Sequence, residues 1–359
     1  MNDLFIKTIL LCSIILLLGG CSSRSLLHDS PTEEPFRPDY SLIFYIHGDS
    51  DYLFHSPGGK AVQANEYALK KALDTAQNAK SGEVTIFHRN EKRSLLRLFP
   101  RNTSRMYQFQ NGKKVKEISY RGDNAASGFM EEEAALFSDH AEGHPGENTP
   151  VIFLYFGHEI PQHSETGYHQ SYSDREFGTE IFAEEIRSFL PNKEIKFDLV
   201  ALSTCNNGTP AMASALKPVA NTILASPQNL HLSHIDVSEL SVFEELSPEE
   251  YDPASVATAL AQDSFNRLSE DVRTTVTLSV YNLDTPVPGI RDLVDRSELY
   301  QRNNRLNYTQ DNIDCAEVLD MTEFTTEDGI RTFFRPAQFG SNRTKEKHSG
   351  WGCKPVLNE

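Results

Sequence analysis

Apolar residues in the middle of the chain gather in short runs, and segments with helical spacing separate these runs. The runs predict strands at 41–46, 83–88, 150–156, 197–202, 221–225 and 274–283. The helical patterns lie at 64–79, 126–141, 176–190, 210–217 and 254–268. Strands that alternate with helices favour a parallel sheet joined by right-handed crossovers. The pattern therefore predicts an α/β fold whose mainly parallel sheet carries helices on both faces.

The segment between the second and third runs follows a different pattern. Arg89 opens a stretch rich in basic residues that extends to Arg105, and we expect it to form a solvated, irregular insertion. Asn111-Gly112 then separates two short runs, 106–110 and 115–120, and this dipeptide is a strong signal for a tight hairpin turn. The sequence therefore predicts an antiparallel hairpin within 106–120.

The first residues have the character of an export signal rather than of a folded element. Lys7 precedes an apolar run at 8–18, which is too short to cross a bilayer comfortably. Gly19, Gly20 and then Cys21 follow, and this ending resembles the lipobox of bacterial lipoproteins. The resemblance implies cleavage before Cys21, lipid on its thiol, and a location at the cell envelope, with the outer membrane as the expected membrane. A plain signal peptide with an incidental cysteine is the alternative.

Domain organisation follows from these patterns and from the composition. Of 359 residues, 1–20 form the predicted signal peptide, and 21–40, which are polar and rich in proline, form a linker. Residues 41–300 form one large domain, and 301–359, which are polar and weakly periodic, form a C-terminal extension. The net charge of −17 argues against a nucleic-acid partner, because phosphate binding needs a basic surface.

Three cysteines remain once the signal has been removed and Cys21 carries lipid. They are Cys205, Cys315 and Cys353. An oxidising compartment favours disulfides, and an odd number of cysteines leaves one thiol that can react. We expect Cys315 and Cys353 to pair and Cys205 to stay free, although the sequence alone also allows all three thiols to be free.

A histidine and this free cysteine follow two consecutive predicted strands. His158 comes just after the run 150–156, and Cys205 comes just after the run 197–202, 47 positions later. In open parallel sheets, sites form beyond the carboxyl ends of the strands, and neighbouring strands lie about 4.8 Å apart. A spacing of about 50 residues from a histidine to a downstream cysteine is typical of caspases. We therefore expect both side chains at one edge of the sheet.

The two side chains together have the chemistry of a cysteine peptidase. A thiolate attacks a carbonyl carbon, and a neighbouring imidazole stabilises it or donates a proton to the leaving amine. The oxyanion that forms needs donors, for which the backbone N–H groups of Glu159 and Cys205 are the candidates. The expected partner is a protein or peptide substrate, and nothing in the sequence predicts a metal or an organic cofactor. We interpret Asp49 and Asp51 as turn residues and His169 as a solvent-facing loop residue.

The residues around this pair resemble the clostripain-like cysteine peptidases, which share the fold of caspases and gingipains. The likeness extends over residues 40–300, and its carrying segments are 151–158, 197–205 and 212–226. The resemblance implies a caspase-like fold, with His158 as general acid/base and Cys205 as the nucleophile of a cysteine endopeptidase that works through an acyl-enzyme.

Two positions depart from the usual pattern of that family. Glu159 stands where the family usually has glycine, and a carboxylate near an oxyanion is unfavourable. Ser203 stands where the family usually has the aspartate of a pocket for arginine or lysine, so a basic substrate residue would be left unpaired. We therefore do not expect Arg/Lys specificity. A catalytically inactive envelope lipoprotein that acts as a binding module is the alternative to an active peptidase.

Two other enzyme classes fit the sequence less well. A nucleophile-elbow hydrolase needs a G-x-S-x-G motif, which is lacking, and its histidine would come later than His231 or His234. A zinc peptidase needs two histidines four positions apart on a helix. His158 and His163 are five positions apart and follow a strand.

Overall fold

The computed structural model describes most of the chain beyond the export signal. The described residues are 36–50, 52–55, 61–91, 93–95, 99–101, 104–122, 129–140, 149–192, 194–230, 243–244, 251–283, 290–303, 311–321 and 329–354. The chain divides into two units, 1–36 and 37–359, and the features below belong to the second. The predicted signal peptide, Cys21 and Asp51 lie outside the described residues. Among the residues that are described, no helix has the length and apolar character needed to cross a bilayer.

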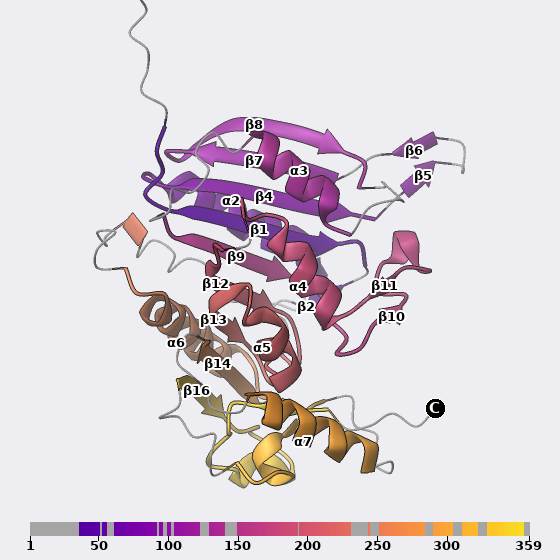
Figure 1. Ribbon diagram of the computed structural model, residues 1–359, viewed down its shortest axis with the longest axis vertical. Coiled ribbons are helices and arrows are strands. Elements are labelled where there is room, and N and C mark those ends of the chain that lie inside the picture. Colours follow the sequence, from indigo (N-terminus) through magenta and orange to yellow (C-terminus); the bar gives the residue numbers. More distant parts are fainter. Residues whose placement is uncertain are drawn as a thin grey trace, which may run out of the picture. The chain divides into compact units, whose positions relative to one another are not determined.

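A nine-stranded sheet forms the centre of the part that the structure describes (Figure 1). Its order is β16 (Ile330–Arg335), β14 (Val276–Asn282), β13 (Ala220–Ala225), β12 (Phe197–Ser203), β9 (Val151–Phe156), β1 (Ser41–Gly48), β4 (Glu83–Asn90), β7 (Ser104–Gln110) and β8 (Lys113–Tyr120). The five strands from β13 to β4 are parallel, and two antiparallel strands flank them on each side. The predicted mainly parallel α/β sheet is therefore confirmed.

Helices cover both faces of this sheet (Figure 1). One face packs against α3 (Glu131–His140), α4 (Thr179–Arg187), α5 (Pro210–Leu216) and α7 (Ile290–Asn303). The other face packs against α2 (Ala64–Asn78) and α6 (Pro253–Asp271). Alternate residues of one strand serve the two cores, because side chains of a strand point to opposite faces in turn. In β9, Phe153 and Tyr155 enter the first core, and Ile152 and Leu154 enter the second.

The remaining described strands form four two-stranded pairs outside the large sheet. They are β2 (Leu53–His55) with β3 (Ala61–Gln63), β5 (Arg93–Leu95) with β6 (Phe99–Arg101), β10 (Glu165–Thr166) with β11 (Glu176–Phe177), and β15 (Ile313–Asp314) with β17 (Gly352–Cys353). The helix predicted from residue 176 therefore begins only at Thr179, since Glu176 and Phe177 pair with β10.

The structure confirms the predicted hairpin but contradicts the solvated position predicted for Arg89. Asn111 and Gly112 have φ angles of 53° and 71°, as a tight hairpin turn between β7 and β8 requires. Arg89, however, is buried at 3% exposure rather than solvated. β4 runs farther than predicted, and the Arg89 guanidinium lies 3.3 Å from Glu133 of α3 and 2.7 Å from the carbonyl of Gly122. The buried carboxylate offsets the charge that would otherwise keep this arginine in water.

The domain also reaches farther along the chain than the sequence suggested. Residues 301–359 were expected to form an extension, yet β16 joins the large sheet beside β14. The sequence did not predict β16, because four of its six residues are only half-buried and its hydrophobic periodicity is therefore weak. At the other end Tyr40, placed in the linker, is 2% exposed, and its hydroxyl donates to Glu244.

Candidate active site

The strands β9 and β12 bring His158 and Cys205 to the same edge of the sheet. The two strands are parallel neighbours, and their last paired residues are Phe156 and Ser203. His158 and Cys205 each stand two residues beyond this pair. Neighbouring strands lie about 4.8 Å apart, and the carboxyl ends of parallel strands share one edge. The register therefore brings the loops that carry the two residues to one edge of the sheet, and both residues are partly accessible to solvent.

Cys205 lies on a loop that joins β12 to α5. Thr209 ends this loop as the N-cap of α5, where its hydroxyl accepts a hydrogen bond from the N–H of Met212 at 3.2 Å, and Pro210 takes the first helical position. The thiol packs against the core on the α2 and α6 face and donates a hydrogen bond to Oδ1 of Asn229 at 2.9 Å.

Burial sets the protonation state of this thiol. Desolvation raises the pKa of Cys205 to about 11, and the charges of Glu159 and Asp311 act in the same direction. A backbone hydrogen bond from Leu230 lowers the pKa but does not overcome the burial. In this structure Cys205 is therefore a neutral thiol at neutral pH, and it becomes a nucleophile only when a base takes its proton.

His158 lies among aromatic side chains. The centre of its ring is 4.8 Å from that of Tyr52. Its carbonyl accepts a hydrogen bond from the hydroxyl of Tyr168 at 3.1 Å, and that hydroxyl lies 2.8 Å from the hydroxyl of Tyr155 on β9. The strand thus positions the loop that carries His158 through two tyrosines.

Asn207 joins the loop after β9 to the loop after β12. Its Oδ1 accepts hydrogen bonds from the N–H of Ile160 at 2.9 Å and from the hydroxyl of Thr204 at 2.6 Å. Its Nδ2 donates to the carbonyl of Ile160 at 2.8 Å. Asn207 is 3% exposed, so these bonds form away from water. The side chain therefore fixes the two loops that carry His158 and Cys205 relative to each other.

The predicted oxyanion donors and the predicted pocket residue lie at the same edge. The N–H groups of Ile160 and Asn206 already donate to Asn207 and to the carbonyl of Gln228, so they are not available to a substrate. The backbone of Glu159 and Cys205 remains the predicted source of oxyanion donors. Ser203 ends β12 partly exposed, as the residue predicted at the floor of a substrate pocket.

The side chain of Glu159 contacts two distant parts of the chain. It forms an ion pair with Lys354, and its Oε2 accepts a hydrogen bond from Nδ2 of Asn206 at 2.7 Å. Asn206 has a φ of 55°, in the left-handed region that asparagine tolerates better than most residues. Positive φ in a residue other than glycine is strained and gathers at functional sites.

A C-terminal tail, defined here as residues 349–354, packs against the loop of Cys205. The structure joins Cys353 of the tail to Cys315, the pair favoured by the sequence, and Cys205 is the free cysteine among the described residues. The N–H of Gly352 donates to the carbonyl of Gly208 at 2.9 Å. Nδ2 of Asn312 donates to the carbonyl of Asn206 at 3.0 Å. Sequence reasoning missed this arrangement, because nothing in the local pattern of the tail points to residues 206–208.

Two histidines near this edge of the sheet, His169 and His47, are buried, and the sequence did not predict their burial. His169 was expected to face solvent but is 1% exposed, because its loop folds back onto the core and its ring stacks on Phe129 at 3.6 Å. His47, at the end of β1, lies 5.0 Å from it, between ring centres. Desolvation, followed by the nearby charge of Arg89, lowers the pKa of His47 far below the usual value and keeps the ring neutral.

Asp49 holds the loop of His169 in place rather than forming a simple surface turn. It accepts hydrogen bonds from the hydroxyl of Ser171 at 2.6 Å and from the Ser171 N–H at 3.3 Å. Burial raises the pKa of Asp49, although these bonds oppose the shift. Within the described ranges no three His, Cys, Asp or Glu side chains are arranged to hold a metal ion.

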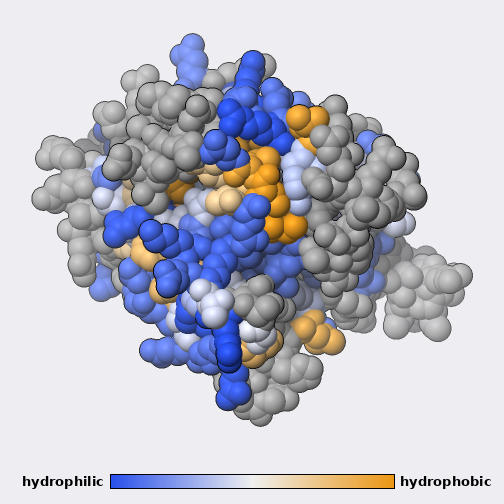
Figure 2. All heavy atoms as spheres, turned by 90° about the horizontal axis from the view of Figure 1, so that it is seen from below, coloured by the Kyte–Doolittle hydropathy of each residue, from blue (hydrophilic) through white to orange (hydrophobic). Residues whose placement is uncertain are grey.

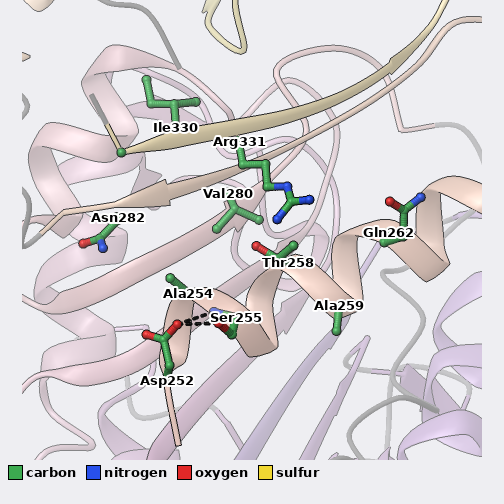
Figure 3. Close-up of a pocket in the computed structure, with 11 residues that line it drawn as sticks. Asp252, Ala254, Ser255, Thr258, Ala259, Gln262, Val280, Asn282, Ile330 and Arg331 are labelled. Atoms are coloured by element: carbon green, nitrogen blue, oxygen red, sulfur yellow. Dashed lines mark hydrogen bonds between the residues drawn. The ribbon is translucent and has the colours of Figure 1, made fainter. Parts of the chain in front are cut away.

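A separate cavity of about 610 Å³ lies on the α6 side of the sheet (Figure 3). Residues of α6, β14 and β16 line it, among them Asp252, Asn282 and Arg331. The residues that line it include neither Cys205 nor His158, nor any residue of the loops that carry them. The side chain of Asp252 is the N-cap of α6, where it accepts a hydrogen bond from the N–H of Ser255. The cavity is therefore not part of the site around Cys205.

Hydrophilic residues cover most of the described surface seen from below, with hydrophobic residues in a few small areas (Figure 2). In the described part of the chain, the large exposed hydrophobic side chains come from separate elements: Leu53, Val115, Leu299 and Phe339.

Comparison with known proteins identifies the fold. No protein-family model matches the sequence. No curated protein matches it either. An X-ray structure of an inactive zymogen C11 protease from Parabacteroides distasonis matches at 11% identity, with a TM-score of 0.56 over 89% of this chain and 93% of that chain. A secreted C11 cysteine protease from Bacteroides thetaiotaomicron in complex with an irreversible peptide inhibitor matches at 11% identity, with a TM-score of 0.49 over 76% of this chain and 74% of that chain. The first of these likenesses shows that the chain has the caspase-like fold of a C11, or clostripain-like, protease.

Proposed function

We propose that this chain, which has the fold of a C11 protease, is a cysteine peptidase with Cys205 as nucleophile and His158 as general acid/base. One observation carries the proposal. The pairing of Phe156 with Ser203 brings the loops that carry His158 and Cys205 to the same carboxyl edge of the sheet. In a sheet of this type that edge is where ligands bind.

The reaction follows from the protonation state of the thiol. Because Cys205 is neutral, His158 takes the thiol proton as sulfur attacks the carbonyl carbon of the peptide. The C–N bond then breaks, and the imidazolium returns the proton to the leaving amine. Water next attacks the thioester, again with His158 as base, and releases the carboxylic acid and the free thiol. The N–H groups of Glu159 and Cys205 stabilise the oxyanion in both steps.

The pocket residue limits which side chain precedes the cleaved bond. Ser203 offers a hydroxyl rather than a carboxylate at the end of β12. A lysine or arginine placed there would lose its hydration without gaining an ionic partner. We propose that the substrate carries a small or uncharged residue at this position.

An inactive binding protein is the second candidate, and one observation favours it. The pKa of Cys205 lies at about 11, above rather than below its ordinary value, whereas the reactive cysteines of many enzymes are shifted downward. A protein that retains the fold without catalysis would bind peptides at the same edge and leave them intact.

A peptide library separates the two candidates. We expect the full-length protein to cleave a pooled library, and Cys205→Ala and His158→Ala each to lower the rate at least about a hundredfold. Mass spectrometry of the products gives both the rate and the residue before each cleaved bond. His163→Ala is the control, because His163 is an exposed histidine of the same loop and should leave the rate unchanged. Equal cleavage by the wild type and Cys205→Ala would remove the peptidase proposal, and products that end mostly in lysine or arginine would remove the proposed specificity.

A further inference from the structure

Both carboxylate oxygens of Glu159 are engaged beside the thiol. Oε1 pairs with the ammonium group of Lys354, and Oε2 accepts the 2.7 Å hydrogen bond from Asn206, the residue that follows Cys205. The side chains of Glu159 and Lys354 are 29% and 23% exposed, so the pair is partly shielded from water. An ion pair in such surroundings is stronger than one in bulk solvent. The carboxylate is thus held in one place, next to the loop that carries the nucleophile.

The tail brings Lys354 to this place. Cys353 is linked to Cys315, and Gly352 and Cys353 pair with the short strand β15. Gly352 is also bonded to Gly208, three residues beyond Cys205. These contacts anchor the residues directly before Lys354 on two sides. The ammonium group therefore meets Glu159 from a fixed backbone rather than from a free chain end.

We propose that Lys354 is a positioning residue of the active site: it neutralises Glu159, so that negative charge can develop on the sulfur of Cys205 and on the substrate oxygen. The inference rests on the proposed function and explains how the site accommodates a carboxylate directly after the catalytic histidine. Without Lys354, the charge of Glu159 opposes both the thiolate and the oxyanion.

The electrostatics of the thiol support this role. Burial is the main cause that raises the pKa of Cys205, and the charges that add to it come from Glu159 and Asp311. His158, which follows the adjacent strand, and Tyr52, whose ring lies 4.8 Å from that of His158, are further titratable side chains at this edge. Removing Lys354 therefore leaves the negative charge of Glu159 acting in full on the sulfur of Cys205. Removing the carboxylate of Glu159 instead removes this unfavourable interaction.

The test measures the thiol directly and needs no peptidase activity. Full-length protein in detergent is treated with iodoacetamide over a range of pH, and mass spectrometry quantifies the peptide that contains Cys205. We expect Lys354→Met to slow alkylation about threefold at any pH below the thiol pKa, because a smaller fraction is thiolate. Glu159→Gln should accelerate it, and the double variant Lys354→Met/Glu159→Gln should match Glu159→Gln alone. Lys354→Arg, which keeps the charge, should restore the wild-type rate.

A matched control separates this effect from a general loss of a lysine. Lys114→Met removes an ion pair with Glu117, of 2.6 Å, on the edge strand β8, and should leave the alkylation profile unchanged. An unchanged profile for Lys354→Met would overturn the inference. A faster reaction would overturn it as well, because it would show that Lys354 obstructs the thiol.

Peptide cleavage provides the second readout. If the wild type cleaves peptides, we expect Lys354→Met to lower kcat about threefold or more with little change in KM, because the charge acts on the transition state. If the wild type cleaves nothing while the alkylation rates shift as stated, the proposed function fails and the charge relation between Lys354 and Cys205 stands.

Discussion

Asn207 connects the two loops that carry the proposed catalytic residues, and all its bonds are local to the site. Three hydrogen bonds link it to Ile160 and Thr204. A buried polar group that loses its partners costs about 1–3 kcal/mol, which is a large share of the stability of a domain. The position of this single amide therefore matters for both stability and geometry.

We expect Asn207→Ala to lower the free energy of unfolding by about 1–3 kcal/mol and to lower kcat/KM more than tenfold, because Ile160 and Thr204 lose their partner. Urea unfolding followed by fluorescence and peptide-cleavage kinetics measure the two effects. Asn78→Ala is the control: Asn78 is exposed and bonds only to a carbonyl of its own helix, at 2.9 Å. An Asn207→Ala protein as stable and active as the wild type would show that other contacts hold the loops together.

At the residue scale, the sequence pointed to the pair that the sheet edge brings together but not to its supports. His158 and Cys205 each follow an apolar run that predicts a strand, so their positions at strand ends could be inferred from the sequence. Asn207 and Ile160 lie 47 positions apart and Lys354 and Glu159 lie 195 apart. Contacts over such separations depend on the assembled fold, and no local spacing encodes them.

At the scale of elements, the strands with the most buried residues were the ones that the sequence predicted best. The central strands were predicted well because both faces of each are buried, which produces continuous apolar runs. α7 and β16 were missed because each contains few fully buried apolar residues among many charged and polar ones, so neither produces a clear apolar run. The antiparallel direction of β14 also had no local signature, because direction depends on how the connecting segment crosses the sheet.

The disulfide is the element-scale support of the tail. It closes a loop with a sequence separation of 38. By the chain-entropy model, we expect Cys315→Ala/Cys353→Ala to lower the free energy of unfolding by about 3–4 kcal/mol, since the unfolded chain gains freedom. Urea unfolding of the variant, compared with the wild type with and without reductant, measures this. A variant with the wild-type midpoint would indicate that the noncovalent contacts of the tail suffice. Reductant should destabilise the wild type and leave the variant unaffected.

At the scale of the whole molecule, the chain combines a caspase-like domain with an N-terminal segment that resembles a lipoprotein signal. We propose that lipid on Cys21 holds the domain at the cell envelope. Stable attachment of this kind requires two or more acyl chains, because a single chain binds membranes only weakly.

We expect the wild type, expressed in a lipoprotein-processing bacterium, to be found in the membrane fraction, and Cys21→Ser to be found largely outside it. Fractionation followed by mass spectrometry of the N-terminal peptide measures both the location and the lipid. Cys12→Ser, which changes a cysteine of the predicted signal, is the matched control and should leave both results unchanged. Membrane association of Cys21→Ser equal to that of the wild type would remove the proposed anchor.

Asn312 and the tail pack on the loop of Cys205 from far along the chain: Asn312 is 106 residues removed from Asn206, and Gly352 of the tail comes later still. A ribosome makes the loop of Cys205 before it makes Asn312 and the tail that pack against this loop. During synthesis, the loop of Cys205 therefore exists for some time without the segments that pack against it. The order of translation itself therefore delays the finished surroundings of Cys205 until nearly all of the described chain has been made.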